Sequence, residues 1–416
     1  MSVTDRIVNY LKNGEFASAN LTDFYQLTTG AALTDMEGWA TTGNMVLRGK
    51  GTETYGIMAG WRYILPAIAD MRYDDAFIDW AQQLTNSLGQ PKLDAGYLNR
   101  LRGLPLPITI DAIPDGSVIF PGPLARITGP ALATKWVDTA INDITRRGIS
   151  VATKVARLVW ASGGKLALAD NSMRRSGDVL GLMVGDICNA MGMPTSNMAV
   201  AQANGTKPAG TMDHWFLSLK VVQYYDAYPQ ANPLDRTTRI DALVYAYRSF
   251  IQANPADGAL LLDLAPLEEG LEAAIIALQQ TAPHNYAVRN DSGNLGTSAV
   301  YIRTKLDKAG LGQIRILLSG GLRAVNIFNL VEEGRPFFGA GIGEYFQPHA
   351  ETKSKGPHEA PVNTEIVTKF GSGTSPSGKM YNSIKISDEP AKASRGGKLD
   401  LWVLTDPDAE GREARI

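Results

Sequence analysis

The 416-residue chain has a single cysteine, Cys188. One thiol cannot form an internal disulfide, and it cannot supply the several ligands of a zinc site. No stretch approaches the roughly 20 apolar residues that span a bilayer. The first residues, MSVTDRIVNYLKNGEF, also lack an apolar core of signal-peptide length. These absences predict a soluble protein of a reducing cytoplasm that has no membrane partner.

Neither sign of charge is in excess, because 40 Lys and Arg residues face 42 Asp and Glu residues for a net charge of −2. This balance gives no electrostatic basis for binding nucleic acid. An anionic ligand would therefore have to be held by a local cluster. Only four histidines occur, and no two have the helical spacing of metal ligands, so we predict no histidine metal site. Three of them, His284, His349 and His358, are expected in turns or at the surface.

The chain is long for one core and predicts two or so domains. In residues 104–129, apolar residues cluster around Pro-Asp-Gly and Pro-Gly turns, which is a hairpin-like β pattern. The pattern becomes helical over residues 132–161. Residues 350–380 are rich in Lys, Ser, Gly and Pro and predict a polar loop. The segment 381–404 regains strand character and is expected to return to the first β-rich region.

After residue 164, short apolar runs alternate with amphipathic stretches. This alternation is typical of βα units around a parallel sheet, and its length favours a barrel over an open sheet. The runs are KLALAD, GALLLDL, NYAVRND, QIRILLSGG and PFFGAGIG, and helices are expected near 177–191, 267–280, 298–309 and 323–332. We therefore predict an α/β barrel over 131–350, and a β-rich domain formed by 1–130 together with about 360–416.

Two late strands end in glycines, in ILLSGGL and FFGAGIG. Barrel enzymes place active sites at the carboxyl ends of strands, and the last two βα loops often bind phosphate. Glycines let backbone N–H groups approach phosphate oxygens, and a helix N-terminus adds a favourable dipole. Gly320, Gly321, Gly339 and Gly341 are therefore candidate phosphate-binding residues. Either motif alone is better explained as a tight turn, whereas the consecutive pair favours phosphate binding.

Charged residues also follow several predicted strands. Arg289 offers a planar donor fork, and Asp291 two residues later can orient a ribose hydroxyl or a ring nitrogen, although an Asp-Ser-Gly turn explains them equally simply. Asp263 stands either at a barrel mouth or at the N-cap of the next helix. Arg174 and Arg175 can neutralise a polyphosphate, but by themselves they are more typical of a solvated surface.

His214 follows Gly210 and Thr211 in the same βα series. A lone histidine is usually structural, yet a neutral imidazole is a competent nucleophile toward a phosphoryl group, and the neighbouring Asp213 is a candidate helper. Tyr25 lies in TDFYQLT, where the pattern alone indicates a packed helix.

Taken together, these stretches resemble the nicotinate phosphoribosyltransferase family. The likeness runs from about residue 20 to about residue 395, and no single motif decides it. The motifs occur in the family's order: TDFYQLT, AIPDGSVIFPG, VDTAINDITRRGISVATKVAR, MRR, TSN, GTMDH, LLLDL, RNDSG, LLSGGL, FFGAG and IKISDEPAK.

The resemblance implies a type II phosphoribosyltransferase fold, with an irregular α/β (TIM-like) barrel and an α/β N-terminal domain completed by C-terminal strands. It implies transfer of phosphoribosyl from phosphoribosyl pyrophosphate to nicotinate, giving nicotinate mononucleotide and pyrophosphate in NAD biosynthesis. ATP hydrolysis would be coupled through a phosphorylated His214. Mg²⁺ would accompany phosphoribosyl pyrophosphate and ATP, and the family usually forms homodimers with the active site at the interface.

The resemblance also implies roles for individual residues. Tyr25 of a second copy would stack on the pyridine ring. Substrate contacts would come from Arg174, Arg175, Ser196, Thr211 and Arg289, orienting carboxylates from Asp263 and Asp291, and the 5′-phosphate loops from Gly320, Gly321, Gly339 and Gly341.

Three positions depart from the family's pattern. Asn294 stands where Asp is common, and nicotinamide-using relatives often carry Asn there. Asp170, in the Asp-Asn-Ser that replaces an aromatic-Gly pair, can accept a hydrogen bond from an amide, whereas a carboxylate would repel nicotinate. Ile342 replaces the Thr of a Gly-Thr pair and removes one hydroxyl, for which the backbone of Gly343 is expected to compensate.

These departures leave two alternatives open, a nicotinamide phosphoribosyltransferase and a non-catalytic nucleotide-binding descendant. Another phosphate-using barrel enzyme would need a lysine or a carboxylate pair that the strand ends do not show.

Overall fold

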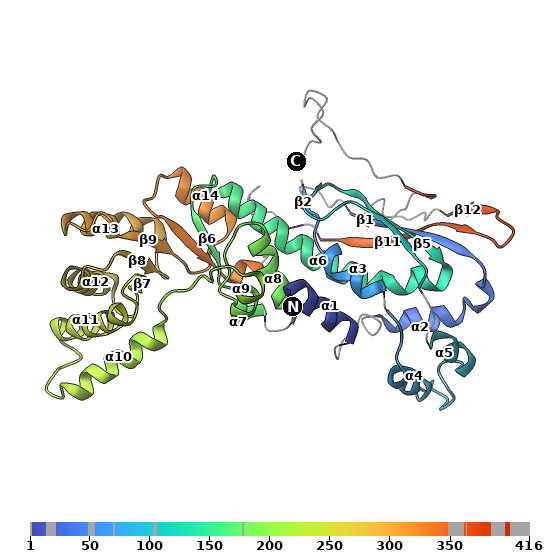
Figure 1. Cartoon of the computed structure of the whole chain (residues 1–416), viewed down its shortest axis with the longest axis horizontal. Coiled ribbons are helices and arrows are strands. Elements are labelled where there is room, and N and C mark those ends of the chain that lie inside the picture. Colours follow the sequence, from blue (N-terminus) through green and yellow to red (C-terminus); the bar gives the residue numbers. More distant parts are fainter. Residues whose placement is uncertain are drawn as a thin grey trace, which may run out of the picture. The chain divides into compact units, whose positions relative to one another are not determined.

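The computed structural model describes residues 2–13, 22–48, 55–69, 71–102, 106–176, 179–347, 362, 364–383 and 396–399. The chain divides into two compact units (Figure 1). The first contains Met1–Lys154, Asp178–Ile187 and Glu351–Ile416, and the second contains Val155–Gly177 and Cys188–Ala350. Among the described residues, no helix combines the length and the apolar character needed to cross a bilayer.

An antiparallel sheet with strand order β12-β11-β1-β5-β3 forms the centre of the first unit. Its strands are β1 (Ala40–Leu47), β3 (Thr109–Ala112), β5 (Gly122–Pro130), β11 (Ile366–Thr374) and β12 (Met380–Asn382). A separate pair joins β2 (Gly56–Ile57) to β4 (Val118–Ile119). The predicted hairpin-like β character of 104–129 is confirmed, because β3, β4 and β5 all lie in it.

The polar loop predicted for 350–380 is wrong where β11 forms. This strand pairs with β1 along its whole length, from Ala40 opposite Thr374 to Leu47 opposite Ile366. The glycines that suggested a loop serve close packing instead, because a Cβ at Gly371 would overlap Asn44 and the backbone of Gly397. The predicted strands in 381–404 lie mostly outside the described residues.

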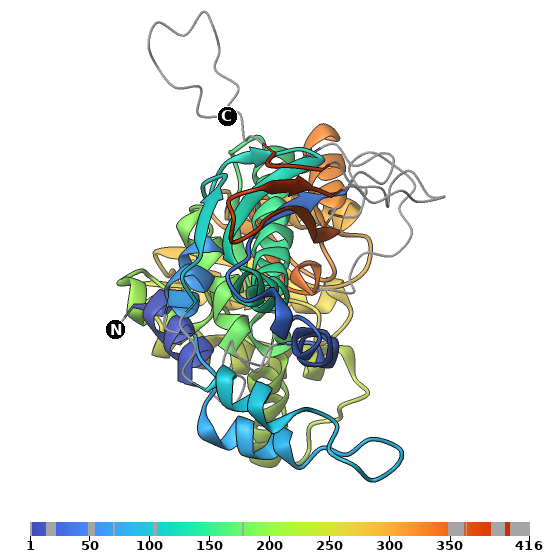
Figure 2. The same cartoon turned by 90° about the vertical axis from the view of Figure 1, so that its right-hand side faces the viewer.

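Helix α6 (Ala131–Ala161) packs against this sheet through its first-unit residues, as Figure 2 shows. Arg146 donates to the carbonyl of Ile366 at 3.0 Å, and the Asn142 amide nitrogen lies 3.3 Å from the Thr368 hydroxyl. The other helices of the unit are α1 (Val3–Asn13), α2 (Phe24–Ala31), η1 (Thr34–Met36), α3 (Trp61–Ala69), α4 (Asp75–Gln82) and α5 (Ala95–Leu101).

The second unit contains a parallel sheet with strand order β6-β10-β9-β8-β7. Its strands are β6 (Ala167–Asp170), β7 (Asp257–Leu261), β8 (Asn285–Asn290), β9 (Arg315–Leu318) and β10 (Gly339–Ile342). Each lies in one of the apolar runs, so the predicted βα series is confirmed. Because the strands are parallel, the residues that follow them meet at one edge. A single parallel bridge between Asp170 and Thr195 extends the sheet beyond β6.

Helices follow every strand of this sheet (Figure 1). They are α7 (Met173–Ser176), α8 (Val179–Ala190), α9 (Met198–Asn204), α10 (His214–Ala227), α11 (Arg236–Ala253), α12 (Leu267–Thr281), α13 (Leu295–Lys308), α14 (Ala324–Glu332) and η2 (Glu344–Phe346). Helix α8 and helix α6 each contribute residues to both units. The strand interiors are apolar, with Leu260, Val288 and Leu318 fully buried.

The contact between Gly270 of α12 and the end of β7 gives a testable prediction. A Cβ on Gly270 would overlap the carbonyl of Leu262. Gly270→Ala should therefore lower the free energy of unfolding by about 2 kcal/mol, although alanine favours a helix. Gly312→Ala is the control, since its Cβ would lie 3.7 Å from the nearest atom, a side-chain oxygen of Asp307. Equal melting temperatures for the two variants in thermal denaturation would contradict the packing argument.

Candidate active site

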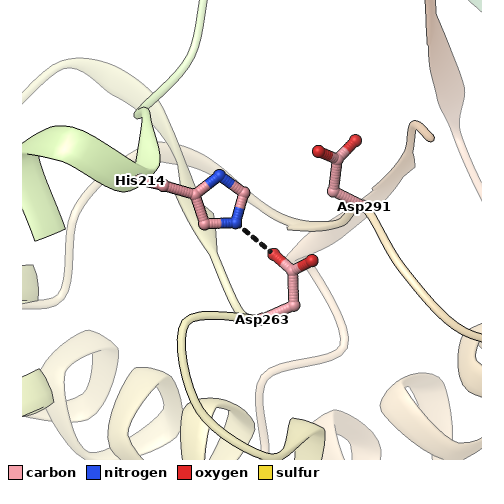
Figure 3. Close-up of side chains that lie close together, drawn as sticks. All are labelled: His214, Asp263 and Asp291. Atoms are coloured by element: carbon pink, nitrogen blue, oxygen red, sulfur yellow. Dashed lines mark hydrogen bonds and ion pairs between the residues drawn. The ribbon is translucent and has the colours of Figure 1, made fainter. Parts of the chain in front are cut away.

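His214 is the first residue of α10, and its position is fixed by a helix cap. The Asp213 carboxylate accepts the N–H of Phe216 at 2.7 Å and caps the helix. The imidazole Nε2 of His214 lies 3.2 Å from Oδ1 of Asp263 (Figure 3). The acid within hydrogen-bonding distance of the imidazole is therefore Asp263, while Oδ1 of Asp213 is engaged by the helix cap.

Asp263 lies just after β7 and is not a helix cap, because Pro266 occupies the N-cap position of α12. Its side chain is 10% exposed, whereas that of His214 is 45% exposed. The pair thus joins a largely buried carboxylate to a solvent-accessible imidazole. The Tyr247 hydroxyl donates to the carbonyl of Leu261 at 2.7 Å, and burial together with the charge of Asp263 raises the pKa of this phenol. Tyr247 therefore stays neutral beside the carboxylate.

Asp291 follows β8, the strand next to β7, and lies beside the same pair (Figure 3). One ligand atom from each of His214, Asp263 and Asp291 lies within 4.8 Å of the others. The three groups come from segments far apart in the chain, so a search for histidine spacing could not detect them. Carboxylate oxygens suit Mg²⁺, and imidazole is more typical of transition metals.

Arg289 brings a positive charge to this cluster from the end of β8. Its Nη1 donates to the Thr211 hydroxyl, and its Nε is buried without a hydrogen-bond partner among the described residues. Burial lowers the pKa of the guanidinium, while the charges of Asp291 and Asp263 raise it. Arginine remains charged in proteins despite such shifts. Arg174 of α7 is close enough to add to the lowering, so a second cation lies nearby.

The glycines of the predicted phosphate loops have different surroundings. Gly320 has a φ of +99°, and a Cβ there would overlap the carbonyl of Asp291. Gly321 has a φ of +65° and open space around it, so its backbone is reachable. Gly341 lies in β10 against Asn171 and Ser319. Gly339 begins β10, where a Cβ would overlap the carbonyl of Ala167, so strand packing alone accounts for this glycine.

Asp170 ends β6, and its side chain is fully buried. One carboxylate oxygen accepts the N–H of Ser172 at 2.8 Å, and the other accepts the hydroxyl of Thr195 at 2.6 Å. The backbone N–H of Ser196 donates to the Asp170 carbonyl at 2.8 Å, which places the TSN segment beside β6. These contacts occupy both oxygens of Asp170 with the protein's own donors.

Asn294 is the N-cap of α13, and its side-chain oxygen accepts the N–H of Thr297 at 3.0 Å. Asn and Asp are about equally good at this position of a helix. The replacement of the family's usual Asp therefore preserves the cap, and helix capping is sufficient to explain the residue.

Two further predicted site residues, Arg175 and Tyr25, make their contacts outside the His214 cluster. Nη1 of Arg175 is 3.5 Å from a carboxylate oxygen of Glu344. Tyr25 belongs to α2 of the first unit and is 51% exposed, with the Lys135 ammonium 5.2 Å from its ring centroid. Burial and the charges of Asp138 and Asp23 raise the pKa of the Tyr25 phenol. An exposed ring of this kind is available to a partner molecule.

Comparison with known proteins finds relatives that carry the name nicotinate phosphoribosyltransferase. No protein-family model matches the chain. It is 26% identical over 391 residues to nicotinate phosphoribosyltransferase pncB1 of Mycobacterium tuberculosis, covering 91% of this chain and 77% of that protein. It is 29% identical over 342 residues to pncB2 of the same organism, covering 79% of this chain and 66% of the relative.

Two solved structures share the fold. Human nicotinic acid phosphoribosyltransferase superposes with a TM-score of 0.63 at 22% identity, covering 77% of this chain and 72% of that one. Nicotinate-nucleotide pyrophosphorylase from Pyrococcus furiosus gives 0.60 at 18% identity, covering 88% and 76%. The fold is therefore the expected type II phosphoribosyltransferase fold. Over 91% of its length the chain is therefore similar to a nicotinate phosphoribosyltransferase, and it shares the fold of the human one.

Proposed function

We propose that this protein transfers the phosphoribosyl group of phosphoribosyl pyrophosphate to nicotinate, forming nicotinate mononucleotide and pyrophosphate for NAD salvage. The observation that carries the proposal is the cluster that His214, at the start of α10, forms with Asp263, Asp291 and Arg289 at the carboxyl ends of β7 and β8. Enzymes built on parallel strands place their chemistry at this edge. The relatives that match most of the chain also carry the name of this activity.

The cluster suits displacement at the anomeric carbon of the ribose. As the bond to pyrophosphate breaks, the sugar gains oxocarbenium character and the leaving group gains negative charge. Arg289 and Arg174 would stabilise the departing charge, and Asp263 and Asp291 would orient the ribose. Asp263 and Asp291 also fit Mg²⁺, which when bound supplies further charge stabilisation to the pyrophosphate.

The His214–Asp263 pair supports coupling to ATP. If Nε2 of His214 donates its proton to Asp263, the lone pair of the ring lies on Nδ1. In the proposed step, Nδ1 attacks the γ-phosphorus of ATP, the bond to the β–γ bridging oxygen breaks, and ADP leaves. Hydrolysis of the resulting phosphohistidine returns the free imidazole and inorganic phosphate. The 45% exposure of the His214 side chain is compatible with this access.

Nicotinate is the proposed base, because the two residues that pointed to nicotinamide have other roles. Asp170 is buried with both oxygens occupied, and Asn294 caps α13. Neither arrangement requires an amide substrate. We also propose a homodimer in which Tyr25 reaches the ring bound by the second copy, a role supported by the exposure of Tyr25.

The first prediction from the proposed function concerns product and ATP dependence. The protein is incubated with phosphoribosyl pyrophosphate, Mg²⁺ and either base, with and without ATP, and mononucleotide is measured by chromatography. Nicotinate should give product faster with ATP, and His214→Ala should lose the acceleration because it lacks the nucleophile. His284→Ala, at an exposed histidine, is the matched control. Preferred use of nicotinamide would overturn the base assignment, and no product from either base would overturn the enzyme assignment.

The second prediction separates the two acids near His214. Asp263→Asn should slow ATP-dependent turnover by a factor of about 100 or more, because the amide cannot hold the same imidazole tautomer. Asp213→Asn should leave turnover within about threefold, since asparagine also caps a helix. Initial rates at saturating substrate test both. If Asp213→Asn is the slower enzyme, the pairing of His214 with Asp263 is not the functional one.

The third prediction tests whether Asn294 selects the base. Asn294→Asp keeps the cap, so the ratio of kcat/KM for nicotinate to that for nicotinamide should change by less than about threefold. Asn294→Ala should lower the free energy of unfolding by about 1 kcal/mol through loss of the cap. A shift of about tenfold toward nicotinate in Asn294→Asp would show that the residue reads the substrate.

A further inference from the structure

Helix α11 contacts both of the segments that carry the His214–Asp263 pair. The ring of Phe250 packs edge-on against Phe216 of α10, two residues after His214, with 5.7 Å between the ring centroids. The same ring lies against β7, because a Cβ on Gly258 would be 2.9 Å from one of its carbons. A single helix therefore touches the helix that begins at His214 and the strand that leads to Asp263.

One turn before Phe250, the Tyr247 hydroxyl meets the end of β7. Tyr247 is fully buried, and its hydroxyl donates to the Leu261 carbonyl at 2.7 Å. β7 is the last strand of the described parallel sheet, with β8 as its neighbour. The N–H of Leu262 donates to the Arg289 carbonyl of β8 at 3.0 Å, and the C=O of a trans peptide points opposite to its N–H. The Leu261 carbonyl therefore faces away from β8, on the side where Tyr247 donates to it.

The peptide held in this way lies directly before Asp263. Its N–H is bound by the Arg289 carbonyl and its C=O by Tyr247, so both sides of the peptide are fixed. Burial and then the charge of Asp263 raise the pKa of the Tyr247 phenol, which places the hydroxyl within electrostatic reach of the carboxylate. Because the phenol stays neutral, it holds the strand end without adding a charge that would compete with the imidazole for Asp263.

We propose that Tyr247 is a positioning residue for the ATP-dependent step. Through the Leu261 carbonyl it holds Asp263 where the carboxylate keeps the proton of His214 on Nε2 and leaves the ring's lone pair on Nδ1. The inference rests on the proposed function, because phosphorylation of His214 is the step that it serves. Tyr247 acts only through the end of β7. Since a small displacement of a reacting group greatly slows a reaction, loss of this one hydroxyl should be felt at His214.

The test compares two variants that each remove one buried phenol hydroxyl. Tyr286 is the matched control, because it is 1% exposed and its hydroxyl donates to the Asn254 carbonyl at 2.6 Å. It lies near the amino end of β8, whereas the site lies at the carboxyl end. Tyr247→Phe and Tyr286→Phe should therefore lower the melting temperature by similar amounts. Only Tyr247→Phe should slow ATP-dependent turnover, by about fivefold or more, with the KM for nicotinate changed by less than about twofold.

A spectroscopic readout separates positioning from stability. The chain has four histidines, so the ring nitrogens of His214 can be identified in nitrogen NMR spectra of histidine-labelled protein by comparison with His214→Ala. At a pH of about 8, where an ordinary imidazole is neutral, the native protein should show the Nε2–H tautomer at His214. Tyr247→Phe should show a mixture of both tautomers, and Tyr286→Phe should show the native signal.

A native tautomer together with full ATP acceleration in Tyr247→Phe would overturn the inference, as would equal losses of rate in the two variants. A native protein that shows the Nε2–H tautomer but forms no mononucleotide would contradict the proposed function, while the tautomers of the two variants would still test the role of Tyr247. A native protein with the proton on Nδ1 would contradict both.

Discussion

Two backbone contacts that only glycine permits hold the carboxylates of the site in place. Gly270 packs against the carbonyl of Leu262, directly before Asp263, and Gly320 packs against the carbonyl of Asp291. Because a side chain at either glycine would push the adjoining loop away, the positions of both carboxylates relative to His214 depend on these contacts. The Asp213 cap of α10 fixes the position of His214, the third member of the cluster. The cluster is therefore set by packing at strand and helix ends.

The sequence predicted the parallel strands well because they are buried on both faces and are continuous apolar runs. It failed at β11, where glycine and serine were read as loop residues, although they allow close approach to β1 and the segment at Gly397. It also paired His214 with its neighbour Asp213. The observed partner, Asp263, is 49 residues away in the chain, and only the parallel order of the strands brings it near.

Comparison with a family's pattern identifies unusual residues but not what they do. Asp170 and Asn294 suggested a different base when taken as substrate contacts. In the structure Asp170 joins β6 to the TSN segment, and Asn294 caps a helix, a role that Asn and Asp fill about equally well. Asn171 lies against Gly341 and Ile342 of β10, and no local sequence pattern shows that neighbour.

The charge balance of the chain means that any anionic ligand must be held by local groups. With a net charge of −2, no general positive field holds an anionic ligand, so each cation must act locally. Yet Arg175 already faces Glu344, and Arg289 lies among Asp213, Asp263 and Asp291. An anion bound beside Arg289 would therefore share the guanidinium with carboxylates of the protein itself.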